Sequence, residues 1–130
     1  MKQKYKGNRQ TIIEEIANSI THGLGFGLSV AALTILVVYA CQEGDPWRII
    51  AFSIYGTSLC ILYLISTLYH SLTQSRIKAM FRRLDHAAIY ILIAGTYTPV
   101  ILISLRTTWV IYLLPVVWLM AIIGVYIKIF

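Results

Sequence analysis

Four long apolar segments constrain the fold of this chain more than any other feature of its sequence. They cover about residues 20–41, 48–70, 85–105 and 109–127, and the charged residues gather between them. Each segment, as a helix rising about 1.5 Å per residue, is long enough to cross the roughly 30 Å hydrocarbon core of a bilayer. We therefore expect an all-α membrane protein with four transmembrane helices. Composition agrees, because hydrophobic residues make up 58% of the 130 residues and charged residues only 12%.

Lysine and arginine are distributed unevenly between the segments that flank and join the spans. Four of them precede the first span and four lie in the 71–84 loop, whereas the 42–47 loop has none and the 106–108 loop has one. Short loops rich in these residues stay in the cytoplasm. The sequence thus predicts a multi-pass protein of the cell membrane, plasma or inner, with a cytoplasmic N-terminus.

The residues before the first span are predicted to differ from the rest of the chain. We expect residues 1–19 to form a cytoplasmic basic arm and a short amphipathic helix, and residues 20–130 to form the transmembrane domain. Thr11 and Glu14 have the spacing of a capping box, which predicts that a helix begins there. Pro99 lies inside the third span and predicts a kink.

Two interpretations of the 71–84 loop are open. Ile77, Met80, Phe81 and Leu84 follow the spacing of one helical face, which favours a short helix lying on the inner membrane surface. The alternative is a polar loop that only obeys the rule on basic loops. On the first interpretation, the cations of the segment would meet anionic lipid headgroups at the cytoplasmic face. The basic residues flank apolar helices, so the net charge of +6 does not indicate nucleic-acid binding.

Polar and ionisable side chains gather at the predicted cytoplasmic ends of three spans. Such groups are costly in a membrane and often have a function. Their helical spacings place the members from the first span on one face, and the two from the second span on another. This pattern is typical of a metal site at the mouth of a helix bundle, where histidine ligates and carboxylates orient it. The set comprises Glu15, Asn18, His22, Ser66, His70, Asp85 and His86.

Each of these residues also has a simpler interpretation. His70 is also consistent with an interfacial residue that merely ends its helix. Asp85 suits the N-cap of the third span by position and chemistry. His22 is placed to form a hydrogen bond between helices, and Glu15 is placed to be solvated.

Small and aromatic residues near these groups are expected to serve packing and anchoring. Gly23, Gly25 and Gly27 are predicted to allow close helix packing. Trp47 and Trp109 lie near span ends, as membrane-interface anchors do.

Four motifs in this order resemble the hemolysin III proteins, the bacterial branch of the progestin and adipoQ receptor family. The stretch 15–25 resembles the opening motif of that family, and Ser66-Thr-Leu-Tyr-His70 resembles its S-x-x-x-H motif. Residues 84–86 and 95–99 resemble the start and middle of its third helix. The resemblance implies seven transmembrane helices, with a cytoplasmic N-terminus, of which this chain would be the N-terminal part.

The resemblance also implies a zinc site near the cytoplasmic side. In the family, one histidine at the end of helix two and two from an H-x-x-x-H motif on helix seven hold the metal. By match, His70 would be the first ligand, Asp85 would hold the metal-bound water, and Ser66 would lie near the site. This sequence has three histidines and no H-x-x-x-H pair, so the other ligands are expected outside it. The supporting residues would be Glu15, Asn18, His22 and His86.

The function implied by the resemblance is that of a zinc-dependent hydrolase acting on a lipid amide. Asp85 would orient water or act as general base, and Ser66 would hydrogen-bond the reacting carbonyl or the water. A cytolytic, pore-forming protein is the alternative from another class, although no span shows a polar stripe to line a channel. A non-catalytic signalling or lipid-homeostasis module is the third.

Overall fold

The computed structural model describes residues 11–106 and 109–130, and these residues form helices joined by short links. Four helices in this part of the chain are long and apolar enough to cross a membrane, which confirms the expected all-α membrane fold. The third continues into a π-helix, η1, and the fourth begins with a 3-10 turn, η2. The elements are α1 (Ile12–Glu43), α2 (Pro46–Ser71), α3 (Ser75–Pro99), η1 (Val100–Ser104), η2 (Trp109–Tyr112) and α4 (Leu113–Ile129).

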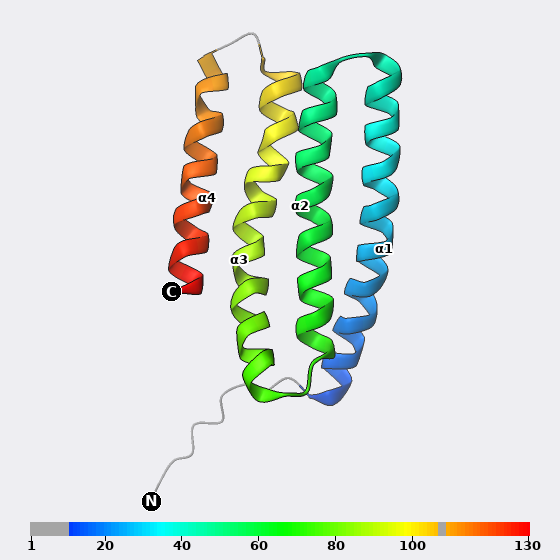
Figure 1. Ribbon diagram of the computed structural model, residues 1–130, viewed down its shortest axis with the longest axis vertical. Coiled ribbons are helices and arrows are strands. Elements are labelled where there is room, and N and C mark those ends of the chain that lie inside the picture. Colours follow the sequence, from blue (N-terminus) through cyan, green and yellow to red (C-terminus); the bar gives the residue numbers. More distant parts are fainter. Residues whose placement is uncertain (1–10, 107–108) are drawn as a thin grey trace, which may run out of the picture.

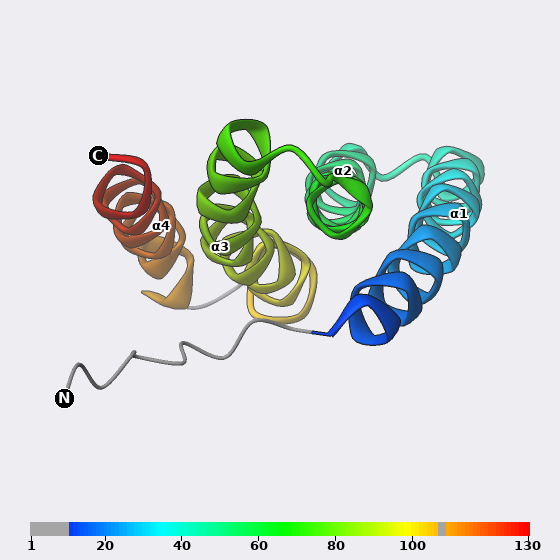
Figure 2. The same ribbon diagram turned by 90° about the horizontal axis from the view of Figure 1, so that it is seen from below.

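The helices stand side by side in chain order, and each packs against the next one in the sequence. Seen from below, they form one curved row with α1 and α4 at its two ends (Figure 2). The lower end of the row in Figure 1 holds the start of α1, the link at residues 72–74 and, a little higher, the end of α4. The upper end holds the link between α1 and α2, the end of η1 and the start of η2. The start of α1 and the link between α2 and α3 thus lie at the same end.

Helix α1 begins at the predicted capping box. Thr11 Oγ1 accepts a hydrogen bond from the Glu14 backbone N–H (3.3 Å), and Glu14 Oε2 accepts one from the Thr11 N–H (2.8 Å). From there α1 runs without a break to Glu43, so residues 12–19 are its first turns and not a separate short helix. The basic arm at residues 1–10 lies outside the described residues. Gly44, at φ 68°, ends α1 in the left-handed conformation that glycine adopts at low cost.

The 71–84 segment is neither a separate surface helix nor a polar loop. The link between α2 and α3 spans only residues 72–74, and α3 is continuous from Ser75 to Pro99. The reason is local, because no glycine or proline interrupts this stretch before Gly95, and the face formed by its apolar residues continues into the span. The N-cap interpretation of Asp85 is therefore wrong, since the N-cap of α3 is Gln74 and Asp85 lies well inside the helix.

The irregularity predicted at Pro99 takes the form of a π-helix. Directly after the proline, η1 follows the wider hydrogen-bonding pattern, in which the Leu105 N–H donates to the Val100 carbonyl (3.1 Å). Proline cannot donate a backbone hydrogen bond, and such local adjustments are a common response to it in membrane helices. Close by, Thr98 is fully buried and accepts a hydrogen bond from Trp118 Nε1 (3.2 Å), which joins α3 to α4.

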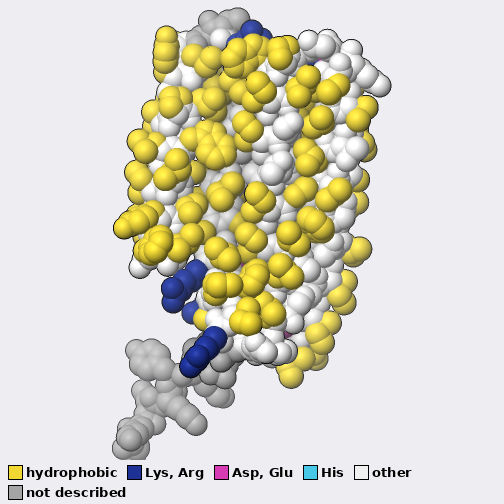
Figure 3. Space-filling model, viewed as in Figure 1, with side chains coloured by type: hydrophobic (Ala, Val, Ile, Leu, Met, Phe, Trp, Pro, Cys, Tyr) yellow, Lys and Arg dark blue, Asp and Glu magenta, His cyan; other side chains and the backbone are white. Residues whose placement is uncertain are grey.

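Small residues fill the contacts between the helices, while large apolar side chains point outward (Figure 3). In lipid there is no gain from hiding leucine or isoleucine, so close approach of small residues drives helix packing. Leu28 and Ile123, for example, are 72% and 49% exposed. The buried apolar residues and small polar residues are Ser29, Ala40, Ala51, Ser58, Ser66, Ala87, Ala88, Ala94, Thr98, Ile101, Leu102 and Ala121.

Glycines differ in how closely the neighbouring helix approaches them. A Cβ at Gly95 would overlap the side chain of Ser58 in α2, and one at Gly25 would lie 2.6 Å from the Tyr63 ring. The packing prediction therefore holds for Gly25. At Gly23 a Cβ would make an ordinary contact of 3.6 Å, and at Gly27 it would meet no described atom within 4 Å.

This difference predicts opposite outcomes for two equivalent substitutions. Gly95→Ala should lower the free energy of unfolding by about 1–3 kcal/mol, because the new methyl group forces α3 away from α2. Gly27→Ala, the matched control, should change it by less than about 1 kcal/mol and in the stabilising direction. Unfolding in detergent, followed by circular dichroism, compares the two. Equal losses for both variants would contradict this account of the α2–α3 contact.

Candidate functional site

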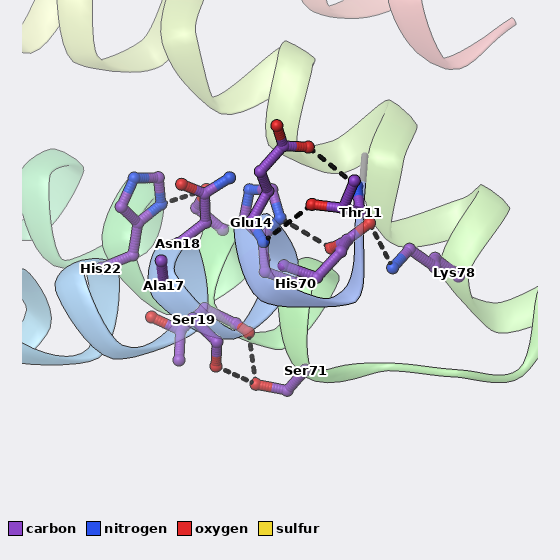
Figure 4. A network of polar contacts seen from close by, with 12 residues as sticks. Thr11, Glu14, Ala17, Asn18, Ser19, His22, His70, Ser71 and Lys78 are labelled. Carbon is purple, nitrogen blue, oxygen red and sulfur yellow. Dashed lines mark hydrogen bonds and ion pairs between the residues drawn. The ribbon is translucent and has the colours of Figure 1, made fainter. Parts of the chain in front are cut away.

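A network of polar side chains lies at the lower end of the bundle, where α1, α2 and the first turns of α3 meet (Figure 4). It is the place at which three helices contribute ionisable groups to one another. Four members were expected from the sequence and one was not. The members are Glu15 and His22 of α1, Ser66 and His70 of α2, and Lys78 of α3.

The carboxylate of Glu15 is the centre of this network. Its Oε2 lies 2.9 Å from His70 Nδ1, and its Oε1 lies 2.8 Å from Lys78 Nζ. The side chain of Glu15 is only 19% exposed, so the interpretation of Glu15 as a solvated residue is wrong. One carboxylate of α1 therefore holds α2 and α3 at once. A partly buried charge of this kind is stable only while its partners are present.

His70 is almost buried, with its side chain 7% exposed, although it lies in the last turn of α2. A carboxylate can only accept hydrogen bonds, so Nδ1 of His70 is the donor toward Glu15. The Tyr69 ring packs against the imidazole with centroids 4.6 Å apart. His70 thus does more than end its helix, because Glu15 fixes the direction of its ring and leaves Nε2 for another partner.

His22 and Ser66 form a second contact between α1 and α2, one turn deeper. His22 Nδ1 lies 2.7 Å from Ser66 Oγ, and Ser66 is buried. The rings of His22 and His70 meet edge to face with centroids 5.5 Å apart. The hydrogen bond between helices, considered for His22 as the simpler interpretation, is thus present. Asn18, on the same face of α1, is half-buried, and the structure describes no hydrogen bond of its side chain.

Asp85 and His86 lie outside this network. His86 is exposed, and its Nδ1 donates to the Arg82 carbonyl in the preceding turn (2.6 Å). It lines a separate hollow beside α4 with Arg82, Arg83 and Lys128. Asp85 is half-buried, and no hydrogen bond or ion pair is described for its carboxylate. The structure therefore brings together the polar residues of α1 and α2 but does not join these two residues of α3 to them.

Lys78 is the network member that the sequence analysis did not single out. The sequence pattern places Lys78 among the basic residues of the 71–84 segment, because the third span is expected to begin only at about residue 85. The helical start at Ser75 places Lys78 in the first turn of α3, opposite Glu15, and over the Tyr69 ring at 5.3 Å. A signal was present in the sequence, since an acidic residue at the same predicted depth needs a cationic partner.

The donor set fits part of a zinc site. A zinc-bound histidine usually donates its second ring N–H to a carboxylate, and Glu15 is in that position toward His70. A catalytic zinc needs about three protein ligands. Within residues 11–106 and 109–130, no three His, Cys, Asp or Glu side chains are grouped closely enough to hold a metal ion. The described residues thus offer one oriented imidazole and its supporting carboxylate.

The fold and this network define an α-helical membrane protein with a buried histidine–carboxylate pair at one end of the bundle. The model of the family described as "Haemolysin-III related" matches residues 10–130. The chain therefore belongs to the haemolysin III-related family, which confirms the resemblance seen in the sequence motifs.

Relatives with curated names are similar along most of this chain. Hemolysin-3 of Bacillus cereus is 48% identical over 130 residues, which cover 100% of this chain and 59% of the relative. The Hemolysin-3 homolog of Bacillus subtilis (strain 168) is 50% identical over 120 residues, covering 92% of this chain and 56% of the relative. The human monocyte to macrophage differentiation factor is 30% identical over 96 residues, 70% of this chain and 39% of the human protein. No solved structure matches the chain.

The chain thus spans somewhat more than half the length of the two bacterial relatives. The match with the Bacillus cereus relative covers all of this chain, including the residues of the polar network. Further elements of such relatives would lie beyond the matched region.

The shared carboxylate predicts a measurable energetic coupling between α1 and α3. In a double-mutant cycle of Glu15→Gln and Lys78→Gln, the coupling free energy should be about 0.5–3 kcal/mol, because each single change leaves the other partner without its counter-charge. The matched control pairs Glu15→Gln with Arg76→Gln, which removes an exposed cation from the same turn of α3. Unfolding in detergent gives both values. A coupling free energy as large for Arg76 as for Lys78 would show that Glu15 responds to the net charge of α3 and not to a specific contact with Lys78.

Proposed function

We propose that this chain supplies the first half of the site of a zinc-dependent membrane hydrolase, with a lipid amide as substrate. The observation that carries the proposal is the orientation of His70, whose Nδ1 is held by Glu15 (2.9 Å) so that Nε2 is left for a metal. The remaining ligands would come from the part of the protein beyond this chain. The proposal places the lower end of the bundle in the cytoplasm, following the distribution of lysine and arginine.

The residues of this chain would divide the work at such a site. Zinc, when bound, would act as a Lewis acid and make water a better nucleophile. Glu15 would keep the proton of His70 on Nδ1 and its ring fixed, and Lys78 would hold Glu15 in place. Ser66, one turn deeper, would use its hydroxyl toward a substrate carbonyl while His22 holds it (2.7 Å).

Asp85 would accept a proton from the attacking water in this scheme. It is the half-buried carboxylate of α3 for which no hydrogen bond or ion pair is described. Its carboxylate is therefore free to orient water or act as general base once the bundle is complete. A membrane-embedded site of this kind suits a lipid that enters from the surrounding bilayer, since large apolar side chains cover the outside of the helices.

Removal of the His70 imidazole tests this proposal on the full-length protein. Purified wild-type protein should contain one zinc per chain, and His70→Ala should lose most of it, because a ligand and the role of Glu15 disappear together. His86→Ala is the matched control and should keep its zinc, since His86 is exposed and outside the network. Metal analysis of the purified proteins gives the result. Unchanged zinc in His70→Ala would exclude His70 as a ligand.

A cytolytic function is the second candidate, because the relatives named Hemolysin-3 carry it in their names. The same two variants separate it from hydrolysis. Leakage of liposomes caused equally by wild-type protein and by His70→Ala would favour cytolysis, since a pore does not need an oriented imidazole. Leakage that disappears together with the zinc would tie membrane damage to the metal site instead.

A further inference from the structure

A basic hollow lies between the first turns of α3 and the end of α4, away from the Glu15 network. It has a volume of about 300 Å³ and is lined by Arg82, Arg83, His86 and Lys128. The hollow lies at the lower end of the bundle, where Figure 3 shows a group of Lys and Arg side chains beside the end of α4. Its charged walls therefore lie near one end of the helices that are apolar enough to cross a membrane.

A second, mostly apolar hollow adjoins it between the same helices. It has a volume of about 200 Å³, and its walls come from Ala79, Met80 and Leu84 of α3 and from Ile129 of α4, with Arg76 and Arg83 at its side. Arg83 lines both hollows. The two hollows thus form a single crevice, whose apolar part lies nearer the lower end of the bundle.

The cations of this crevice have no anionic partner among the residues that the structure describes. Among the described residues, Lys78 alone forms an ion pair from α3, and the acidic side chains Glu15 and Asp85 line neither hollow. By contrast, Arg48 at the upper end pairs with Glu43 and Asp45 (3.5 and 3.6 Å). Close cations without counter-charges repel one another, so the crevice favours a ligand that brings net negative charge.

Charge and position together select the class of ligand. The charge favours an anion, and the end of helices that are long and apolar enough to cross a membrane is the position of lipid headgroups. A zwitterionic lipid would bring no net charge to the cations. Basic pockets between transmembrane helices are known sites for anionic headgroups.

We propose that this crevice binds one anionic phospholipid, with its phosphate between Arg82, Arg83 and Lys128. Its acyl chains extend from there toward the middle of the bilayer. The negative charge of the bound lipid offsets part of the positive charge of these side chains. The proposal is independent of zinc and of the hydrolase function, because none of these residues belongs to the Glu15 network.

Competition between lipids tests this site on the full-length protein. The protein is reconstituted in nanodiscs of phosphatidylglycerol and phosphatidylcholine in equal amounts, and the lipid that remains bound is identified by native mass spectrometry. Wild-type protein should retain phosphatidylglycerol in preference to phosphatidylcholine. The double variant Arg82→Gln/Arg83→Gln should lower the ratio of bound phosphatidylglycerol to bound phosphatidylcholine roughly tenfold or more, since each cation contributes to headgroup attraction. The control Arg48→Gln/Arg106→Gln removes the same charge at the upper end and should keep the preference.

Two further measurements separate loss of the lipid site from poor folding and from binding of phosphate alone. Arg83→Lys retains the charge and should retain the preference, even where the double variant folds poorly by circular dichroism. Inorganic phosphate in excess should not displace the lipid, because phosphate has no acyl chains to anchor it in the bilayer. Equal loss in both double variants, loss in Arg83→Lys, or displacement by inorganic phosphate would each overturn the proposal.

Discussion

The carboxylate of Glu15 is the point at which three of the four described helices are joined. It contacts His70 of α2 and Lys78 of α3 with different oxygens, at 2.9 and 2.8 Å. Because the carboxylate is largely buried, loss of either partner leaves an uncompensated charge, which is far more costly than loss of an exposed pair. The direction of the His70 ring and the place of Lys78 next to α1 both follow from this contact.

Above this polar end, the bundle follows the packing rules of lipid and not those of water. Helices approach through glycine, alanine and serine, and bulky side chains face outward, as at Gly95 against Ser58. Such contacts gain little from burial of apolar area and much from close fit. The few polar contacts are therefore needed to set which helix faces lie together. Trp118, which donates to Thr98, has this role between α4 and α3, where no ionisable pair is described.

Periodicity and charge distribution predicted the four spans and the common depth of the polar residues of α1 and α2, because these follow from hydropathy and helical spacing alone. They did not predict that α3 begins at Ser75, since a basic stretch between two spans looks like a loop when its pairing is unknown. Because the start of α3 was placed too late, the role of Lys78 in the network was not predicted, and Asp85 was interpreted as an N-cap. The pairing of Glu15 with His70 could not be read from the sequence either, because it depends on how α1 and α2 turn toward each other.

The central claim is that Glu15 holds the proton of His70 on Nδ1, and nitrogen-15 NMR of the imidazole tests it most directly. In full-length protein labelled at histidine, His70 should show a protonated Nδ1 hydrogen-bonded to a carboxylate, and this signature should weaken in Glu15→Gln but persist in Glu14→Gln. Assignment follows from the signal that disappears in His70→Ala. A neutral His70 that carries its proton on Nε2, with Nδ1 unprotonated, would contradict the account.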